Sequence, residues 1–425
     1  MKLPEITPTA VARGSALESS LRRYQPLLTF ALWGALIIVG GYHLGLQASS
    51  IGLQAPMGSW ETVYAAIARV WPAQYQWIHY VEGHDGYGPG YPAFVRPFLL
   101  TGLGVYVAHR VANLVAIALA CALVVRLLLK QGCPIRVAAA ITVIFYALNA
   151  GSYSIQARPD FLVLLEIAGL FALGDAVVRG RLKLGTGFGV GFGLLTLAAF
   201  LTKAYAAFAW AAVLGYLALF VDGKGAIRVA LISGTILGAG IALFASLNPL
   251  YVLEVYRGQV VQAAPSFAWF RQQTADFSLL AGGLLGAALL PLTIGWVRRK
   301  SGPAATRVEP SECYWRWQVL IALVGLVAGP GWHTGAYLTY FLHLLLVPLL
   351  MLAGLKAAAA GPAARSGFEL AFLANLAVLI IAAPAWPRPD AAWAELREDI
   401  LQEPGRVAVD YLMNPSPGKN QASWL

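Results

Sequence analysis

Charged side chains are scarce in this sequence. Of its 425 residues, 12% are Asp, Glu, Lys or Arg, whereas 59% are hydrophobic and the mean hydropathy is +0.66. Soluble globular domains carry about 25% charged residues, so this composition excludes the soluble class and indicates an integral membrane protein. The formal net charge of +10 must first be divided between the two sides of a membrane. It does not indicate nucleic-acid binding.

Cysteine is also rare, and the three residues Cys121, Cys133 and Cys313 lie far apart in the sequence. They have neither the spacing of zinc ligands nor the even number that a disulfide framework needs. The first hydrophobic segment follows a mixed N-terminal stretch and lacks a small-residue cleavage site after it, so we predict a retained signal anchor.

Long apolar windows fill most of the chain. A bilayer core about 30 Å thick needs roughly 20 apolar residues per helix, and about 11 such windows can be counted. The sequence therefore predicts an all-α integral membrane protein. Its spans are predicted at residues 27–46, 106–129, 135–150, 160–178, 186–201, 204–221, 226–246, 278–297, 317–330, 336–355 and 368–385.

The charges between these windows predict the orientation. If the N-terminal segment 1–26 is cytoplasmic, the inside connections are short and hold most of the 30 Lys and Arg residues, as the positive-inside rule requires. The transmembrane domain then covers 27–385, and the tail 386–425 is extracytoplasmic and begins a small outer domain. We expect a multi-pass protein of the inner (plasma) membrane.

Two outer connections are large, at residues 47–97 and 247–277, so chemistry is expected on the outer face. In the first of them, ETVYAAIARVW (Glu61–Trp71) places Val63, Ile67 and Val70 at helical spacing. This pattern predicts an interfacial helix that lies flat on the membrane.

Glycines recur at four-residue steps in the predicted span 186–201. Gly185, Gly189 and Gly193 form the series, with Gly187 and Gly191 between them. Close helix packing explains such a series better than a phosphate-binding loop does.

Ionisable residues near a span need a reason, because a charge at the bilayer centre costs about 2.5–3.5 kcal/mol. Lys203 interrupts a long apolar run at the outer junction of two spans. It either extends its ammonium group to the interface or binds a phosphate together with the outer Arg257 and Arg271. Arg158 and Asp160, at the outer start of another span, form a local ion pair or contribute to the same site. Phosphate at this face indicates a lipid phosphate.

The stretch GWHTGAYLTYFLH places His333, Tyr337 and Tyr340 on one helical face. Aromatic anchoring at the interface explains the tyrosines about as well as the lining of a ligand cavity does. His333 as an interface histidine with satisfied hydrogen bonds remains the simpler interpretation.

The first outer loop holds the polar segment VEGHDGYGPGYPAF (Val81–Phe94). Its glycines and prolines predict turns and extended backbone, and its aromatic content predicts packing against the membrane. We expect His84, Asp85, Tyr87 and Tyr91 to line an outward-facing cavity.

The order of these elements resembles the GT-C superfamily. These are polytopic membrane glycosyltransferases that use polyprenyl-phosphate sugars, with protein O-mannosyltransferase-like and aminoarabinose-transferase-like branches. The resemblance covers about residues 27–355. It rests on the segment 61–71, Tyr87-Gly-Pro89, Arg110 beside the second span, Ala-Arg-Pro-Asp at 157–160, Leu-Thr-Lys at 201–203, and Gly331 with Gly335-Ala-Tyr337.

The resemblance implies an outward-facing cavity and a catalytic carboxylate from the first loop. Many members carry an Asp-Glu doublet where this chain has Trp60-Glu61, so the base is either Glu61 or Asp85. Glu61 has the alternative role of a cap at a helix N-terminus. The leaving lipid phosphate would be stabilised by the cations at Lys203, Arg257, Arg271 and Arg158.

The partners implied by the resemblance are a polyprenyl-phosphate-linked sugar donor, a lipid, glycan or protein acceptor, and the bilayer. A divalent metal is left open, because some relatives use one and others do not, and no dense cluster of ligands stands in the sequence. Two other functions compete with the transferase. One is a transporter or flippase of a lipid-linked or anionic substrate, and the other is a catalytically inactive partner of the same fold.

Overall fold

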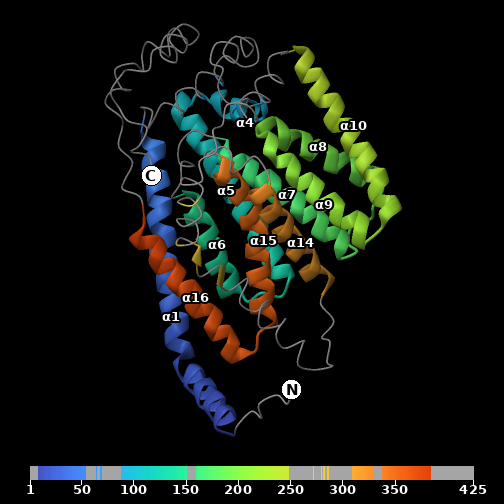
Figure 1. Cartoon of the computed structure of the whole chain (residues 1–425). Helices are drawn as coiled ribbons and strands as arrows, with labels where there is room; N and C mark the ends of the chain where they lie inside the picture. The colour runs from blue at the N-terminus through green and yellow to red at the C-terminus, as the bar shows by residue number, and fades with distance from the viewer. Residues whose placement is uncertain are drawn as a thin grey trace.

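The computed structural model is helical throughout the part of the chain that it describes (Figure 1). This part comprises residues 8–53, 88–150, 159–247, 309–328 and 337–383, together with residues 64, 68, 271, 279, 281, 282, 285 and 286. The side chains of residues 8–22, 52, 326–328, 337–342, 362 and 363 are outside the description.

Several consecutive helices are joined by short connections, whereas long segments separate α1 from α4 and α10 from α14. Their bounds are α1 Pro8–Gly52, α4 Gly90–Leu99, α5 Val105–Lys130, α6 Ile135–Ala150, α7 Asp160–Val178, α8 Thr186–Thr202, the 3₁₀ helix η2 Ala204–Ala206, α9 Ala207–Phe220, α10 Gly223–Leu247, α14 Pro310–Ala328, α15 Tyr337–Ala359 and α16 Pro362–Ile381. Because connections of two to seven residues reverse the chain, consecutive helices run in opposite directions through most of the bundle.

Five described helices are long and apolar enough to cross a membrane: Arg23–Ile51 within α1, Val105–Lys130, Asp160–Val178, Gly223–Leu247 and Ala364–Ile381. Shorter apolar helices cover Ile135–Ala150, Thr186–Thr202, Ala204–Phe220 and His343–Ala359. The predicted class of all-helical membrane protein is therefore confirmed. The count of about 11 spans remains a prediction, since most of window 278–297 lies outside the described residues.

Two details differ from the sequence prediction. Helix α1 begins at Pro8, well before the expected residue 27, and it runs through Pro26. Turns and extended backbone were expected up to Pro92, but α4 begins at Gly90 and continues through Pro92. Proline is tolerated in the first turn of a helix because the amide hydrogens there have no intrahelical acceptor.

The glycines of α8 provide close packing, as predicted. A Cβ atom on Gly193 would lie 2.8 Å from Cα of Ser233 in α10, and one on Gly189 would lie 3.1 Å from Cβ of Ile232. Gly185, Gly187 and Gly191 have no such neighbour within 4 Å. Only one side of the series therefore serves the contact of α8 with α10, which lie side by side at the right of Figure 1.

An aromatic group joins α14 to α7. The rings of Phe171 and Trp315 meet edge to face with centroids 6.3 Å apart, and Tyr314 donates a hydrogen bond to the Phe171 carbonyl at 2.9 Å. Between membrane helices such close contacts supply much of the stabilisation, because lipid is as apolar as the side chains.

We call the end of the bundle where α5, α7, α9 and α15 finish the basic end. Two ion pairs join different helices there, Arg136 with Glu369 at 2.5 Å and Lys356 with Glu312 at 2.5 Å. Two more form between residues four positions apart, Arg179 with Asp175 at 2.8 Å and Arg316 with Glu312. Arg179 also donates to Ser311 at 2.6 Å. These contacts tie the starts of α14 and α16 to the bundle.

Candidate functional site

A buried ion pair lies at the other end of the bundle, which we call the Lys203 end. Nζ of Lys203 donates to Oδ1 of Asp160 at 2.7 Å, and the two residues are 3% and 7% exposed. The sequence predicted both residues for the site, and the structure brings them together. The ammonium group is enclosed by the protein, which does not fit the alternative in which it extends to the interface.

Lys203 lies at a break between two helices. Helix α8 ends at Thr202, Lys203 has extended backbone (φ −152°, ψ 121°), and η2 starts at the next residue. Asp160 stands directly after Pro159, in the first turn of α7, where a carboxylate is favoured by the helix dipole. The break and the helix start thus place opposite charges face to face.

A second acid of α7, Glu166, accepts a hydrogen bond from Thr202, the residue before Lys203. Thr202 Oγ1 donates to Oε1 of Glu166 at 3.1 Å and lies 3.0 Å from the Ala198 carbonyl. Glu166 is 8% exposed, and its Oε2 has no hydrogen-bond partner within the described part of the chain. Asp160 and Glu166 therefore fix two consecutive residues at the end of α8.

A histidine from α15 completes the group. Nδ1 of His343 lies 3.2 Å from the Tyr205 hydroxyl, and His343 is 6% exposed. The charges of Asp160 and Lys203 both act on His343. The Lys203 cluster, which we define as Asp160, Lys203, Tyr205 and His343, thus draws side chains from α7, η2, α15 and the residue between α8 and η2.

The end of the connection between α1 and α4 packs on the last residues of α8, next to this cluster. A Cβ on Gly88 would lie 2.0 Å from the Leu201 carbonyl oxygen, and one on Gly90 would lie 2.4 Å from Thr202 Oγ1. Contacts this close are open only to glycine. The residue immediately before Lys203 therefore touches the start of α4.

Tyr91, which the sequence placed in the cavity, is 1% exposed. Its hydroxyl lies 3.2 Å from Nδ1 of His109 in α5, and its ring meets that of Tyr64 edge to face at 5.6 Å. Tyr64 and Ala68, the two described residues of the segment predicted as an interfacial helix, are both helical and buried.

The beginning of the first outer loop is fixed by an arginine. Nη1 of Arg110 donates to the carbonyl oxygens of Ser50 at 2.6 Å and Leu53 at 2.5 Å, and the residue is 1% exposed. These carbonyls belong to the last turn of α1 and the residue after it, and the last carbonyls of a helix lack intrahelical donors. Arg110 therefore caps α1 where the outer loop leaves it.

The structure describes only some of the other predicted site residues. Arg271 is helical and exposed, and Tyr337 and Tyr340 lie in the first turn of α15, without described side chains. The residues outside the described part are Glu61, His84, Asp85, Tyr87, Arg158, Arg257 and His333. Within the described part, no three His, Cys, Asp or Glu side chains come together as metal ligands would.

Sequence reasoning missed His343, Tyr205, Glu166 and His109. Glu166 had a visible signal, since it interrupts the apolar run between Asp160 and Asp175, and an acid within a span is a functional candidate by default. His343 closes the stretch in which three other residues were chosen. Tyr205 and His109 resemble many interface aromatics and gave no signal of their own.

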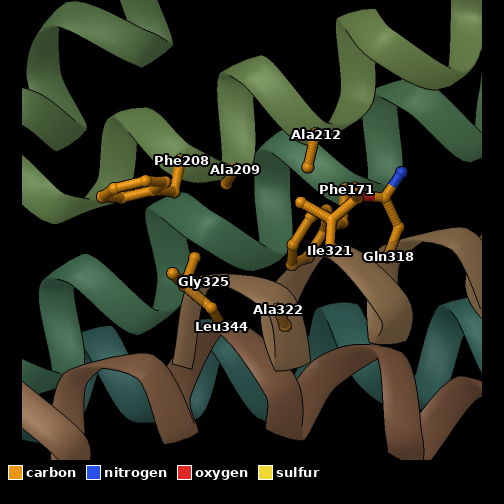
Figure 2. A pocket seen from close by; sticks show the side chains of 9 residues that line it. All are labelled: Phe171, Phe208, Ala209, Ala212, Gln318, Ile321, Ala322, Gly325 and Leu344. Carbon is orange, nitrogen blue, oxygen red and sulfur yellow. The ribbon is translucent and has the colours of Figure 1, made fainter. Parts of the chain in front are cut away.

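A small apolar pocket of about 10 Å³, roughly the room of one water molecule, lies between helices of the bundle (Figure 2). Residues of α7, α9, α14 and α15 line it, among them Phe171, Phe208, Gln318 and Leu344. Leu344 directly follows His343, so one lining residue is the chain neighbour of a member of the Lys203 cluster. Gln318 is 1% exposed, and neither of its amide atoms has a partner among the described residues.

Comparisons with known proteins add no relative: no family model matches the chain, and no curated protein matches it.

Proposed function

We propose that the chain is a membrane glycosyltransferase that moves a sugar from a polyprenyl-phosphate donor to an acceptor hydroxyl at the extracytoplasmic face. The observation that carries this proposal is the buried ion pair of Lys203 and Asp160, at the end of the bundle where the first outer loop returns to α4. A buried ammonium group at a helix break, in a bundle of apolar helices, suits the phosphate of a lipid-linked donor.

Chain connectivity supports a carboxylate near this ion pair. Asp85 precedes Gly88 by three residues and Glu61 precedes Tyr64 by three, and three residues span at most about 11 Å. Gly88 packs on Leu201, and Tyr64 packs on Tyr91 beside Gly90. Chain length alone thus limits the distance of each candidate base from a described residue, Gly88 for Asp85 and Tyr64 for Glu61.

The proposed reaction needs little beyond these groups. The acceptor oxygen bonds to the anomeric carbon, and the bond from that carbon to the lipid phosphate oxygen breaks. The electron pair leaves on the phosphate, the first-loop carboxylate takes the acceptor proton, and the configuration at the carbon inverts. Lys203 has three N–H donors, of which Asp160 accepts one, and it stabilises the charge that develops on the phosphate.

The test is sugar transfer in reconstituted membranes, with polyprenyl-phosphate mannose and polyprenyl-phosphate aminoarabinose as the two donor probes. Loss of a general base lowers the rate by about 10²–10⁴-fold, so we expect this effect from Glu61→Gln or Asp85→Asn. Lys203→Met should cost roughly 10²–10³-fold. If both acid variants insert stably and transfer sugar at the full rate, the proposal is wrong.

Folding must be separated from chemistry at Lys203. Because Lys203→Met leaves the Asp160 carboxylate without its ammonium partner, the double variant with Asp160→Leu is the matched control. The double variant should migrate as a single species in gel filtration and still lack transfer. A chain that binds donor but never transfers it would instead support the inactive partner of the same fold.

Glu166 favours a second candidate function. An acid buried inside a membrane span is typical of transporters that couple to protons, and Glu166 stands six residues inside the start of α7. Glu166→Gln decides between the two. It should abolish movement of a lipid-linked substrate between leaflets if the chain is a transporter, and should leave sugar transfer within a few-fold if the chain is the transferase.

A further inference from the structure

Six cations at the basic end are exposed. They are Arg126, Lys130, Arg181, Lys183, Lys224 and Arg228. In the part of the chain that the structure describes, none of the six forms a hydrogen bond or ion pair. The other cations that pair at this end are bound to acids: Arg136 and Lys356 to acids of other helices, and Arg179 to Asp175 of α7.

The six residues form one continuous surface, which we call the basic patch. Lys130, at the end of α5, is close enough to Arg126 and Arg181 for their charges to act on it, and the carboxylate of Asp175 acts on it in the opposite sense. The connection that holds Arg181 and Lys183 touches the next one, since a Cβ on Gly225 would lie 3.0 Å from Cβ of Leu184. Three helix ends thus contribute to a single basic surface.

The backbone under the patch is fixed. Gly180 has a φ of +68°, a conformation that glycine adopts without strain. The amide of Arg181 donates to the Ala176 carbonyl at 2.8 Å, and the amide of Gly180 donates to the Val177 carbonyl at 2.8 Å. This is a glycine-dependent helix C-terminus, and it sets the direction in which Arg181 leaves α7.

The nearby acids are already engaged. Asp175 accepts from both Arg179 and Ser311. Asp222 accepts from the Gly225 amide at 3.1 Å and so caps the first turn of α10. Neither carboxylate pairs with a residue of the patch, so the patch attracts an external anion.

The depth of the patch identifies that anion. Arg126 and Lys130 belong to the apolar span Val105–Lys130 itself, and exposed Leu129, Leu182 and Ile227 alternate with the cations. A soluble protein or nucleotide would reach only the connections, whereas a phospholipid places its phosphate at this level and its chains beside the leucines.

We propose that the basic patch binds the phosphate headgroup of an anionic phospholipid in the leaflet at the basic end. The patch is a site for a lipid partner, and it stands whether or not the chain is a glycosyltransferase. Anionic lipid at this position links the ends of α5, α7 and α10, which the ion pairs of the basic end do not join.

The test uses the purified full chain in a zwitterionic detergent. Phosphatidylglycerol and phosphatidylcholine with the same acyl chains are added, and thermal unfolding and bound lipid by native mass spectrometry are measured. We expect phosphatidylglycerol to raise the melting temperature more than phosphatidylcholine does, and added salt to remove the difference. A cation near a membrane surface contributes about 1 kcal/mol, which is roughly fivefold in affinity. The triple variant Arg181→Gln, Lys183→Gln, Lys224→Gln should therefore bind roughly a hundredfold more weakly.

The matched control is Arg23→Gln, an exposed cation on α1 outside the patch, which should bind as the unchanged chain does. Equal effects of the two lipids would overturn the proposal, as would unchanged binding by the triple variant or an equal loss in Arg23→Gln. Stabilisation by soluble glycerol phosphate as large as that by phosphatidylglycerol would mean an anion site without lipid specificity. If the triple variant does not fold, the binding of phosphatidylglycerol by Arg181→Gln is compared with that by Arg181→Lys. Only Arg181→Gln removes a charge, so only it should bind the lipid more weakly.

Discussion

Gly90 lies so close to Thr202 that a Cβ atom on it would come within 2.4 Å of the threonine Oγ1 and 2.7 Å of its amide nitrogen. This contact joins the end of the first outer loop to the residue before Lys203. It makes the position of the loop and the position of the ammonium group depend on each other.

A methyl group at the adjacent contact, that of Gly88 with Leu201, should therefore push the end of the loop away from the end of α8. Gly88→Ala meets the Leu201 carbonyl, which cannot move without disturbing α8, and overpacking of this kind costs about 1–3 kcal/mol. We expect a lower melting temperature and reduced donor binding, measured in detergent with polyprenyl phosphate as the probe. Gly41→Ala, with no atom within 4 Å of the new methyl group, should change neither. Normal binding by Gly88→Ala would show that the loop contact does not position the site.

The ion pair of Lys203 and Asp160 should show strong coupling in a double-mutant cycle. Removing one partner leaves an uncompensated buried charge, which costs about 3–5 kcal/mol, so Lys203→Met and Asp160→Leu should each unfold at lower temperature. The double variant should recover most of the loss, because two apolar side chains of similar size replace the pair. Additive losses in the double variant would mean that the two residues act independently.

The packing of α8 on α10 gives a matched pair of glycine variants. Gly193→Ala places its methyl group 2.8 Å from the Ser233 backbone, whereas Gly187→Ala points into open space on the same helix. We expect the first to lower the melting temperature in detergent and the second to leave it unchanged or raise it slightly, since alanine is the better helix former. Equal effects would contradict the one-sided contact.

The cysteines offer a test of orientation. Cys313 is exposed at the start of α14, at the basic end, and Cys133 is buried in the connection between α5 and α6. A membrane-impermeant maleimide should label Cys313 in inverted vesicles and leave it unlabelled in right-side-out cells. Labelling from the outside would reverse the predicted topology. Cys313→Ser should abolish the rapid labelling of inverted vesicles.

Cys133 should stay unreactive in the folded chain. Burial raises the pKa of its thiol to about 12, an effect that the Arg365 guanidinium partly opposes, and maleimide reacts with the thiolate. Because the pKa of the folded state lies above that of the unfolded state, the burial contributes stability below about pH 9 that is lost as the pH rises toward 12. The advantage in unfolding free energy over Cys133→Ser should decrease over this range.

The apolar windows predicted the membrane helices well, because span length and composition are local properties of the chain. The sequence predicted that Lys203 and Asp160 belong to one site, but it did not predict that they form an ion pair with each other. The two residues are separated by 43 positions, and nothing local states that their side chains meet. His343 and Tyr205, 138 positions apart, were missed for the same reason.

The start of α4 was misjudged for a different cause. Glycine and proline favour turns in an isolated segment, but here packing of Gly88 and Gly90 on α8 and of Tyr91 on α5 outweighs that preference. Tertiary contact decided the backbone where local propensity pointed to a turn.

Helix α9, which follows Lys203 through η2, has 14 residues. At 1.5 Å per residue it is about 21 Å long, well short of a hydrocarbon core about 30 Å thick. A helix of this length crosses a bilayer only if the bilayer thins beside it, flanking residues reach the interface or neighbouring helices cover its ends. The η2 turn before α9 lengthens the apolar helix to Ala204–Phe220, so the backbone break at Lys203 lies at the end of a segment that is still shorter than a full span.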